Sequence, residues 1–239
     1  SNMRLWKRSF EKYHLTQTPE NGFGETPLKK YRRHIFLLHP NKVVIYDELE
    51  ANEKVRWDWL LHSPVKFDIN PAASILTTVN KEKGFSSVVQ LFCEQEAAIT
   101  QTDKYAAPPN HADAQRGEDF TDPWSLTASF GPSRNNRILT IIQVEADGRQ
   151  AVQIMREGNT FRCGEWVIEA ELNAKRPGRL YIRNSRNNAV FSYGDKKPEI
   201  NGELYSCKEK DASVLFDCVN GEWTVQEMGD QRVQTMGKW

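Results

Sequence analysis

Three side chains in the first third of the chain, His34, Asp47 and His62, are of the types that bind divalent transition metals. Two neutral imidazoles and a carboxylate suit Zn²⁺ or a similar cation, and three protein ligands plus a water are a common arrangement. Each side chain stands at or near the end of an apolar run, where a buried carboxylate without a partner is strongly unfavourable. The residue types therefore predict a metal site, most simply one for zinc.

A simpler interpretation of the same side chains needs no metal. Asp47 then caps a turn or forms an ion pair with Arg32 or Arg33, and the two histidines hydrogen-bond to backbone carbonyl groups. Both interpretations remain open at the level of the sequence.

The strands that carry these residues decide whether they can meet. If the strands form a plain meander with turns at Pro40–Asn41 and at Asn52, Asp47 lies beside the first strand, whereas His62 lies closer to His39. An offset of about five residues at roughly 3.4 Å each then separates His62 from Asp47 by about 17 Å. A site with all three ligands therefore requires a bulge, a strand crossing between sheets or another strand order. A plain meander predicts a pair of His39 and His62 instead.

Two tryptophans and two arginines in the same stretch could contact a sugar polymer. Trp57 and Trp59 share one face of a strand, where they form either a stacking platform for sugar rings or part of the core. Arg32 and Arg33 belong to the basic run 29–34, and their fork geometry suits sulfate or uronate carboxylate groups, although a solvated strand entry is an equal alternative. We predict these four residues as substrate-binding.

Strand patterns dominate the sequence from about residue 34 onward. Short runs rich in Val, Ile, Phe, Tyr, Trp and Thr alternate with clusters of Asn, Gly, Pro and Asp, which are typical of turns. About a dozen strands without helical crossovers indicate an antiparallel sandwich or barrel. Runs that are apolar on both faces, such as "IFLL" and "VVIY", must be covered on both sides and favour more than two stacked sheets. We therefore predict an all-β, large antiparallel β-sandwich over residues 31–239, with 1–30 as a linker or edge segment.

Composition and the absence of motifs weaken the case for several function classes. Lysine plus arginine equals aspartate plus glutamate at 32 each, so no overall field attracts nucleic acid or an anionic membrane surface. The longest apolar runs fall far short of the roughly 20 residues that span a bilayer. Dinucleotide, NTP, zincin, serine hydrolase and EF-hand motifs are absent. The four cysteines contain no CxxC pair, so we expect small buried side chains rather than disulfides, with Cys207 and Cys218 as the pair to test.

The ends and the longest connection of the chain also carry predictions. Ser1-Asn2 ahead of Met3 resembles a tag-removal scar, so we expect a piece of a longer protein. The connection from Asp103 to Pro123 is long for a compact domain, and such loops are usually either functional or disordered. A functional loop, with His111, would make the chain a self-contained sandwich enzyme.

The stretch "RRHIFLLHPNKVVIYDELEANEKVRWDWLLHSP" resembles the β-sandwich domain of heparinase II/III-like polysaccharide lyases. In that family an R-H-hydrophobic strand is followed by "vvvyDelea" and by a tryptophan-rich strand that ends in histidine. The resemblance is specific over Tyr31–Phe67 and diffuse afterwards. It implies a metal site at His34, Asp47 and His62, an acidic polysaccharide as substrate, an N-terminal helical toroid as partner domain, and a periplasmic or secreted parent protein.

The reaction that the resemblance implies is β-elimination at a uronic acid. The uronate carboxylate is neutralised, a base removes the C5 proton, and an acid protonates the leaving glycosidic oxygen. In the family this chemistry belongs to the helical toroid, and this chain has no long amphipathic helical series. We therefore expect a C-terminal sandwich that supports the cleft and is inactive alone, with no catalytic residue assigned to it. The alternative is a carbohydrate-binding or structural sandwich without a catalytic parent.

Overall fold

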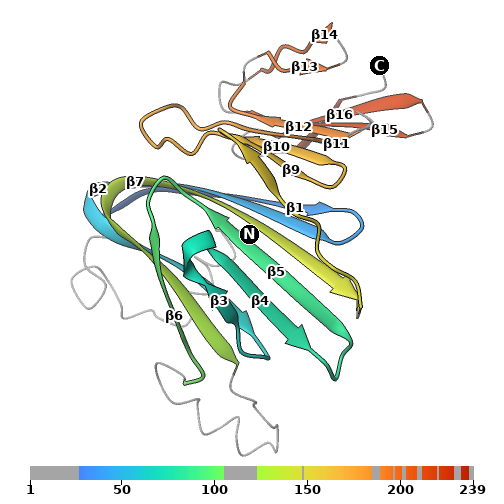
Figure 1. Ribbon diagram of the computed structural model, residues 1–239. Coiled ribbons are helices and arrows are strands. Elements are labelled where there is room, and N and C mark those ends of the chain that lie inside the picture. The colour runs from blue at the N-terminus through green and yellow to red at the C-terminus, as the bar shows by residue number, and fades with distance from the viewer. Residues whose placement is uncertain are drawn as a thin grey trace, which may run out of the picture.

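The computed structural model describes residues 27–104, 123–146, 148–184, 189–195, 197–200, 203–208, 212–219, 221–228 and 233–236. Within this part the chain forms two large antiparallel sheets and one small hairpin (Figure 1), which confirms the predicted all-β sandwich. Of the predicted linker 1–30, residues 1–26 lie outside the described residues, and the first strand begins at Leu28. No helix in the described part is long and apolar enough to cross a membrane.

The first sheet has seven strands in the order β1-β2-β7-β5-β4-β3, with β6 also paired to β7. A 3-10 turn, η2 (Pro71–Ala73), follows β3. The strands are β1 (Leu28–Leu38), β2 (Lys42–Ser63), β3 (Asp68–Asn70), β4 (Ile75–Asn80), β5 (Phe85–Phe92), β6 (Ala97–Thr102) and β7 (Trp124–Ala146).

The strands β2 and β7 are unusually long, at 22 and 23 residues, and the sheet curls where both of them bend (Figure 1). The register shifts between Glu50 and Val55 and again between Val55 and Trp57, which marks bulges at the bend. The first half of β2 pairs with the second half of β7, and the second half of β2 pairs with the first half of β7. The inner face of the curl therefore closes around its own core.

The turn at Asn52 that a plain meander would need is not formed, because β2 continues through this residue as one strand. The segment "ANEKVR" contains no glycine or proline that would favour a chain reversal, so the extra residues are absorbed in bulges. The segment "GPSRNN", residues 131–136, has the Gly, Pro and Asn content typical of turns, but it likewise lies inside β7, opposite the same bend. Proline is tolerated within a strand at such bulges. Both turn patterns therefore mark a bend in two paired strands.

The second sheet has eight strands in the order β17-β16-β15-β12-β11-β10-β9-β8, and a separate hairpin joins β13 to β14. The strands are β8 (Met155–Glu157), β9 (Thr160–Cys163), β10 (Trp166–Ala170), β11 (Leu180–Asn184), β12 (Ala189–Tyr193), β13 (Glu199–Ile200), β14 (Glu203–Leu204), β15 (Ser213–Val219), β16 (Glu222–Met228) and β17 (Val233–Met236).

Three apolar cores are stacked through the molecule. The first lies between the two sheets and includes Tyr46 and Phe161, the second fills the curl of the first sheet around Trp59, and the third lies on the other face of the second sheet around Tyr205. The period-2 alternation of strands explains this division, because successive residues of β2 and β7 face different cores. The strands that are apolar on both faces are thus covered by the second sheet on one side and by the curl of the first sheet on the other, with two large sheets in place of the expected larger stack.

The four cysteines are all free thiols. Cys163 is buried, and Cys93, Cys207 and Cys218 are partly buried. Only Cys163 therefore matches the expected small buried side chain, and the pair Cys207 and Cys218 is not joined.

Candidate functional site

A groove with a volume of about 350 Å³ opens on the inner side of the curled sheet. Residues of β1 and of the first half of β2 form one side, and residues beyond the bend of β2 form the other. Its size lies at the lower end of the roughly 300–1,000 Å³ typical of small-molecule sites. The lining consists of Leu28, Tyr31, Arg33, Asp47, Leu49, Trp57, Asp58, Trp59 and Ile138.

An ion pair between Arg33 and Asp47 is the main polar feature of the groove. The two residues are register partners on β1 and β2, and Arg33 donates from Nε to Asp47 Oδ1 at 2.6 Å and from Nη2 to Oδ2 at 2.9 Å. The Asp47 side chain is 1% exposed and that of Arg33 is 34% exposed. This bidentate geometry matches the alternative in which Asp47 pairs with an arginine.

Burial raises the pKa of the Asp47 carboxyl above its ordinary value, and the hydrogen bonds and charge of Arg33 oppose that rise. The hydrogen bond to Asp47 raises the pKa of Arg33, so the guanidinium keeps its charge. The Arg33 guanidinium is thus charged, and the Asp47 carboxylate in the groove wall compensates its charge.

Tyr31 places an aromatic ring beside this ion pair. Its side chain is 46% exposed, and the guanidinium carbon of Arg33 lies 5.6 Å from the ring centroid. Burial, followed by the charge of Asp47, raises the pKa of the Tyr31 phenol, which therefore stays protonated and can donate a hydrogen bond. The sequence interpretation missed Tyr31, although the alternation of β1 places it on the same face as Arg33.

The two predicted tryptophans line the groove but belong to the core. Trp57 is 9% exposed and Trp59 is 3% exposed, and Trp57 Nε1 donates to the carbonyl and hydroxyl oxygens of Ser133 at 3.1 Å. Trp59 Nε1 is buried and has no hydrogen-bond partner among the described residues. The rings therefore form a wall of the groove instead of an exposed stacking platform.

Asp58 is the second carboxylate of the lining, and both of its oxygens are engaged. Oδ1 accepts from Ser129 Oγ at 2.7 Å, and Oδ2 accepts from Arg56 Nη2 at 3.0 Å. The Ser129 hydrogen bond is the main cause of the lowered pKa of the Asp58 carboxyl, so the group is ionised at neutral pH.

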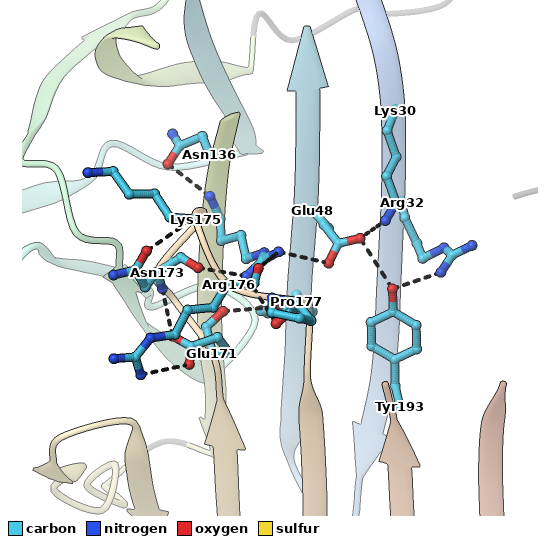
Figure 2. Close-up of polar contacts among 12 residues, drawn as sticks. Lys30, Arg32, Glu48, Asn136, Glu171, Asn173, Lys175, Arg176, Pro177 and Tyr193 are labelled. Carbon is cyan, nitrogen blue, oxygen red and sulfur yellow. Dashed lines mark hydrogen bonds and ion pairs between the residues drawn. The ribbon is translucent and has the colours of Figure 1, made fainter. Parts of the chain in front are cut away.

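Arg32, which the sequence pairs with Arg33 as substrate-binding, points to the opposite side of the sheet. Its Nη1 donates to the Tyr193 hydroxyl at 2.7 Å, and its guanidinium carbon lies 5.3 Å from the centre of that ring (Figure 2). The alternation along β1 separates the two arginines, since neighbouring residues face opposite sides. Of the two, only Arg33 reaches the groove.

The three predicted metal ligands are not brought together. His34 is the register partner of Tyr46, so it faces the second sheet, whereas Asp47 faces the groove. The His34 ring packs 4.4 Å from that of Tyr193 and 5.9 Å from that of Phe191, measured between ring centroids. Burial, with the nearby charges of Arg32 and Lys30, lowers the pKa of His34 to about 4. The imidazole is therefore neutral at physiological pH.

His62 lies farther along the same strand as Asp47, beyond the bend, and is the register partner of Ser125. His39 precedes β2 and His62 stands near its other end, so the pair expected from a plain meander is not formed either. Among the described residues no group of three or more histidine, cysteine, aspartate or glutamate side chains could hold a metal ion. Strand alternation puts His34 and Asp47 on opposite sides of the sheet, and His62 lies far along β2 from both because β2 does not reverse at Asn52.

The zinc ion itself stays a prediction. Elemental analysis of protein purified without a nickel column tests it, and stoichiometric zinc that is lost in both the Asp47→Ala and His62→Ala variants would support the original assignment. His111, proposed for the site of a self-contained enzyme, lies outside the described residues.

Behind the groove, a buried ionic network joins the two sheets (Figure 2). The Glu48 side chain is 2% exposed, and its Oε1 accepts hydrogen bonds from Lys30 Nζ and, at 3.2 Å, from the Tyr193 hydroxyl. Its Oε2 lies 3.4 Å from Arg137 Nη2. Because Glu48 directly follows Asp47 and faces the other side of β2, this network fixes the strand from the side opposite the groove.

Arg137 extends the network into the connection between β10 and β11. Its guanidinium donates to the carbonyl oxygens of Asn173 at 2.8 Å, Arg176 at 2.6 Å and Pro177 at 3.4 Å. Gly178 follows at once, and a Cβ atom added there would stand 1.5 Å from Glu48 Oε2. A side chain at position 178 would therefore force the Glu48 carboxylate to move within its buried network.

Comparison with models of known protein families and with curated proteins finds no match for this chain.

Proposed function

We propose that this chain is the C-terminal β-sandwich domain of a uronate polysaccharide lyase of the heparinase II/III-like kind, and that its groove contacts the polysaccharide. The observation that supports the proposal is the position of the groove residues in the sequence. All of the lining except Leu28 and Ile138 comes from the stretch between Tyr31 and Phe67 that resembles the family. The resemblance and the groove thus concern the same two strands.

The chemistry of the groove favours binding over elimination. β-Elimination needs a base that can take the C5 proton and an acid for the leaving oxygen. In the groove, Asp47 is held by Arg33, both oxygens of Asp58 are hydrogen-bonded, and the phenol of Tyr31 has a raised pKa. We therefore assign the reaction to the helical toroid of the parent protein and a supporting role to this domain.

A second candidate function is a carbohydrate-binding module with no catalytic parent. The half-exposed ring of Tyr31 beside paired polar groups favours it, because an apolar ring face and adjacent hydrogen-bonding groups suit a sugar ring. The reading frame upstream of Met3 separates the two candidates. Several hundred residues with helical patterns support the lyase, and a signal peptide directly upstream supports the module.

Two assays test the lyase proposal. The first follows the ultraviolet absorbance of unsaturated uronate on glycosaminoglycan and alginate substrates, with this chain alone and with the full-length parent. We expect product only from the parent. Elimination by this chain alone would overturn the division of labour between the two domains.

The second assay measures oligosaccharide binding to this chain by isothermal titration calorimetry. We expect the Tyr31→Ala variant to bind roughly five- to tenfold more weakly, as expected for the loss of one aromatic contact. Arg162→Ala is the control, because Arg162 is an exposed residue of β9 in the second sheet. Absence of binding by the unaltered chain, or equal binding by Tyr31→Ala, would contradict a role for the groove.

A further inference from the structure

We propose that the groove holds an uncharged sugar ring of the polymer instead of its uronate, and that Asp47 is the residue that sets this preference. The inference rests on the proposed function, since it names which unit of the polysaccharide the groove contacts. In a polymer that alternates uronate with a neutral sugar, the neutral unit would occupy the groove and the uronate would lie outside it.

The charges of the groove lining carry the first step. Three of the lining residues are charged at neutral pH, namely Arg33, Asp47 and Asp58, and together they contribute one positive and two negative charges. The nearby Arg56, which pairs with Asp58, brings the sum to zero. A uronate carboxylate would therefore meet no net positive charge, in contrast to the cationic surfaces that attract anionic ligands.

The geometry of Arg33 carries the second step. Recognition of a carboxylate by arginine is strongest when two parallel hydrogen bonds form, and Arg33 already gives Nε and Nη2 to Asp47 in that manner. Asp47 is held at 1% exposure, so it cannot turn into solvent to release the guanidinium. A carboxylate beside Arg33 would also lie close to the Asp47 charge, which repels it.

The remaining donors suit hydroxyl groups. Arg33 Nη1 has no hydrogen-bond partner among the described residues, and the protonated phenol of Tyr31 is a second donor. Both can donate to the oxygens of a sugar ring, while the exposed part of the Tyr31 ring can contact its apolar face. A neutral pyranose has the matching groups, namely hydroxyl oxygens that accept hydrogen bonds and an apolar ring face.

The test compares two sugar probes on this chain and on two variants. The probes are an N-acetylhexosamine disaccharide and a short alginate oligomer, in which every unit is a uronate, and binding is measured by isothermal titration calorimetry. For the unaltered chain we expect the neutral probe to bind at least tenfold more tightly. Asp47→Asn keeps the shape of the side chain but releases the charge of Arg33, so we expect it to bind alginate at least fivefold more tightly than the unaltered chain does.

Asp58→Asn is the matched control, because it makes the same change in the charge of the lining but frees Arg56, while Arg33 stays paired with Asp47. We expect it to change alginate binding less than twofold. A salt titration of the unaltered chain gives a second measurement that requires no variant. Binding of the neutral probe should not change between 50 and 500 mM salt, whereas a carboxylate held by Arg33 would dissociate as salt rises.

Two results would overturn the inference in distinguishable ways. Tighter binding of alginate than of the neutral probe, sensitive to salt and unchanged in Asp47→Asn, would refute the preference and leave the proposed polysaccharide binding intact. Failure of both probes and of longer glycosaminoglycan fragments to bind would refute the preference together with the role of the groove in the proposed function.

Discussion

Replacing Arg137 by methionine should destabilise the fold substantially, because it breaks the buried network between the two sheets. The Arg137 side chain is 6% exposed and lies against Glu48, which is 2% exposed. Removing one partner of a buried ion pair costs about 3–5 kcal/mol, since the other charge stays buried without compensation. Glu48 keeps its contacts with Lys30 and Tyr193, so we expect the lower end of that range, about 3 kcal/mol.

Urea unfolding followed by tryptophan fluorescence measures this change, and the thermal midpoint should fall by about 6–12 °C for a chain of this size. Arg176→Met is the control, because its ion pair with Glu171 involves an arginine that is 68% exposed and should contribute no more than about 1 kcal/mol. A loss below about 1 kcal/mol for Arg137→Met, comparable to that of the control, would refute the view that this network fixes β2 behind the groove.

Two further predictions concern single positions in the same region. The pKa of His34 is lowered from 6.5 to about 4, so below pH 6.5 the unfolded chain takes up a proton that the native chain does not. Relative to His34→Phe, the unaltered protein should therefore lose roughly 3 kcal/mol of stability between pH 7 and pH 4. Urea unfolding across that pH range measures the loss. A stability difference that does not vary with pH would contradict the buried neutral imidazole. Gly178→Ala should destabilise the fold by about 2 kcal/mol or more, because its Cβ would overlap Glu48. Gly131→Ala is the control and should be close to neutral, since nothing lies within 4 Å of the added atom. Equal thermal midpoints for the two variants would show that the close approach does not matter for stability.

Local sequence patterns predicted one part of the groove and not another. The ion pair of Asp47 with Arg33 was among the alternatives that the residues themselves suggested, because a buried carboxylate next to a basic run has few other partners. The sequence could not place His62, because the absence of a turn at Asn52 depends on the bulges that β2 forms against β7, a strand about 80 residues away in the chain. Long-range pairing of that kind leaves no periodic pattern in either segment.

The sequence by itself determined the all-β antiparallel class, since the class depends on composition and on the period of a strand. The same period separates Arg32 from Arg33, although the two were predicted to bind substrate together. Only the tertiary structure decided that two long strands bend together. That bend brings Trp57 and Trp59 opposite Arg33 and Asp47, and it carries His62 away from them. The reason is physical: a bulge in one strand is stabilised by the strand paired with it and by the core that the curled sheet encloses, so it cannot be located from either strand alone.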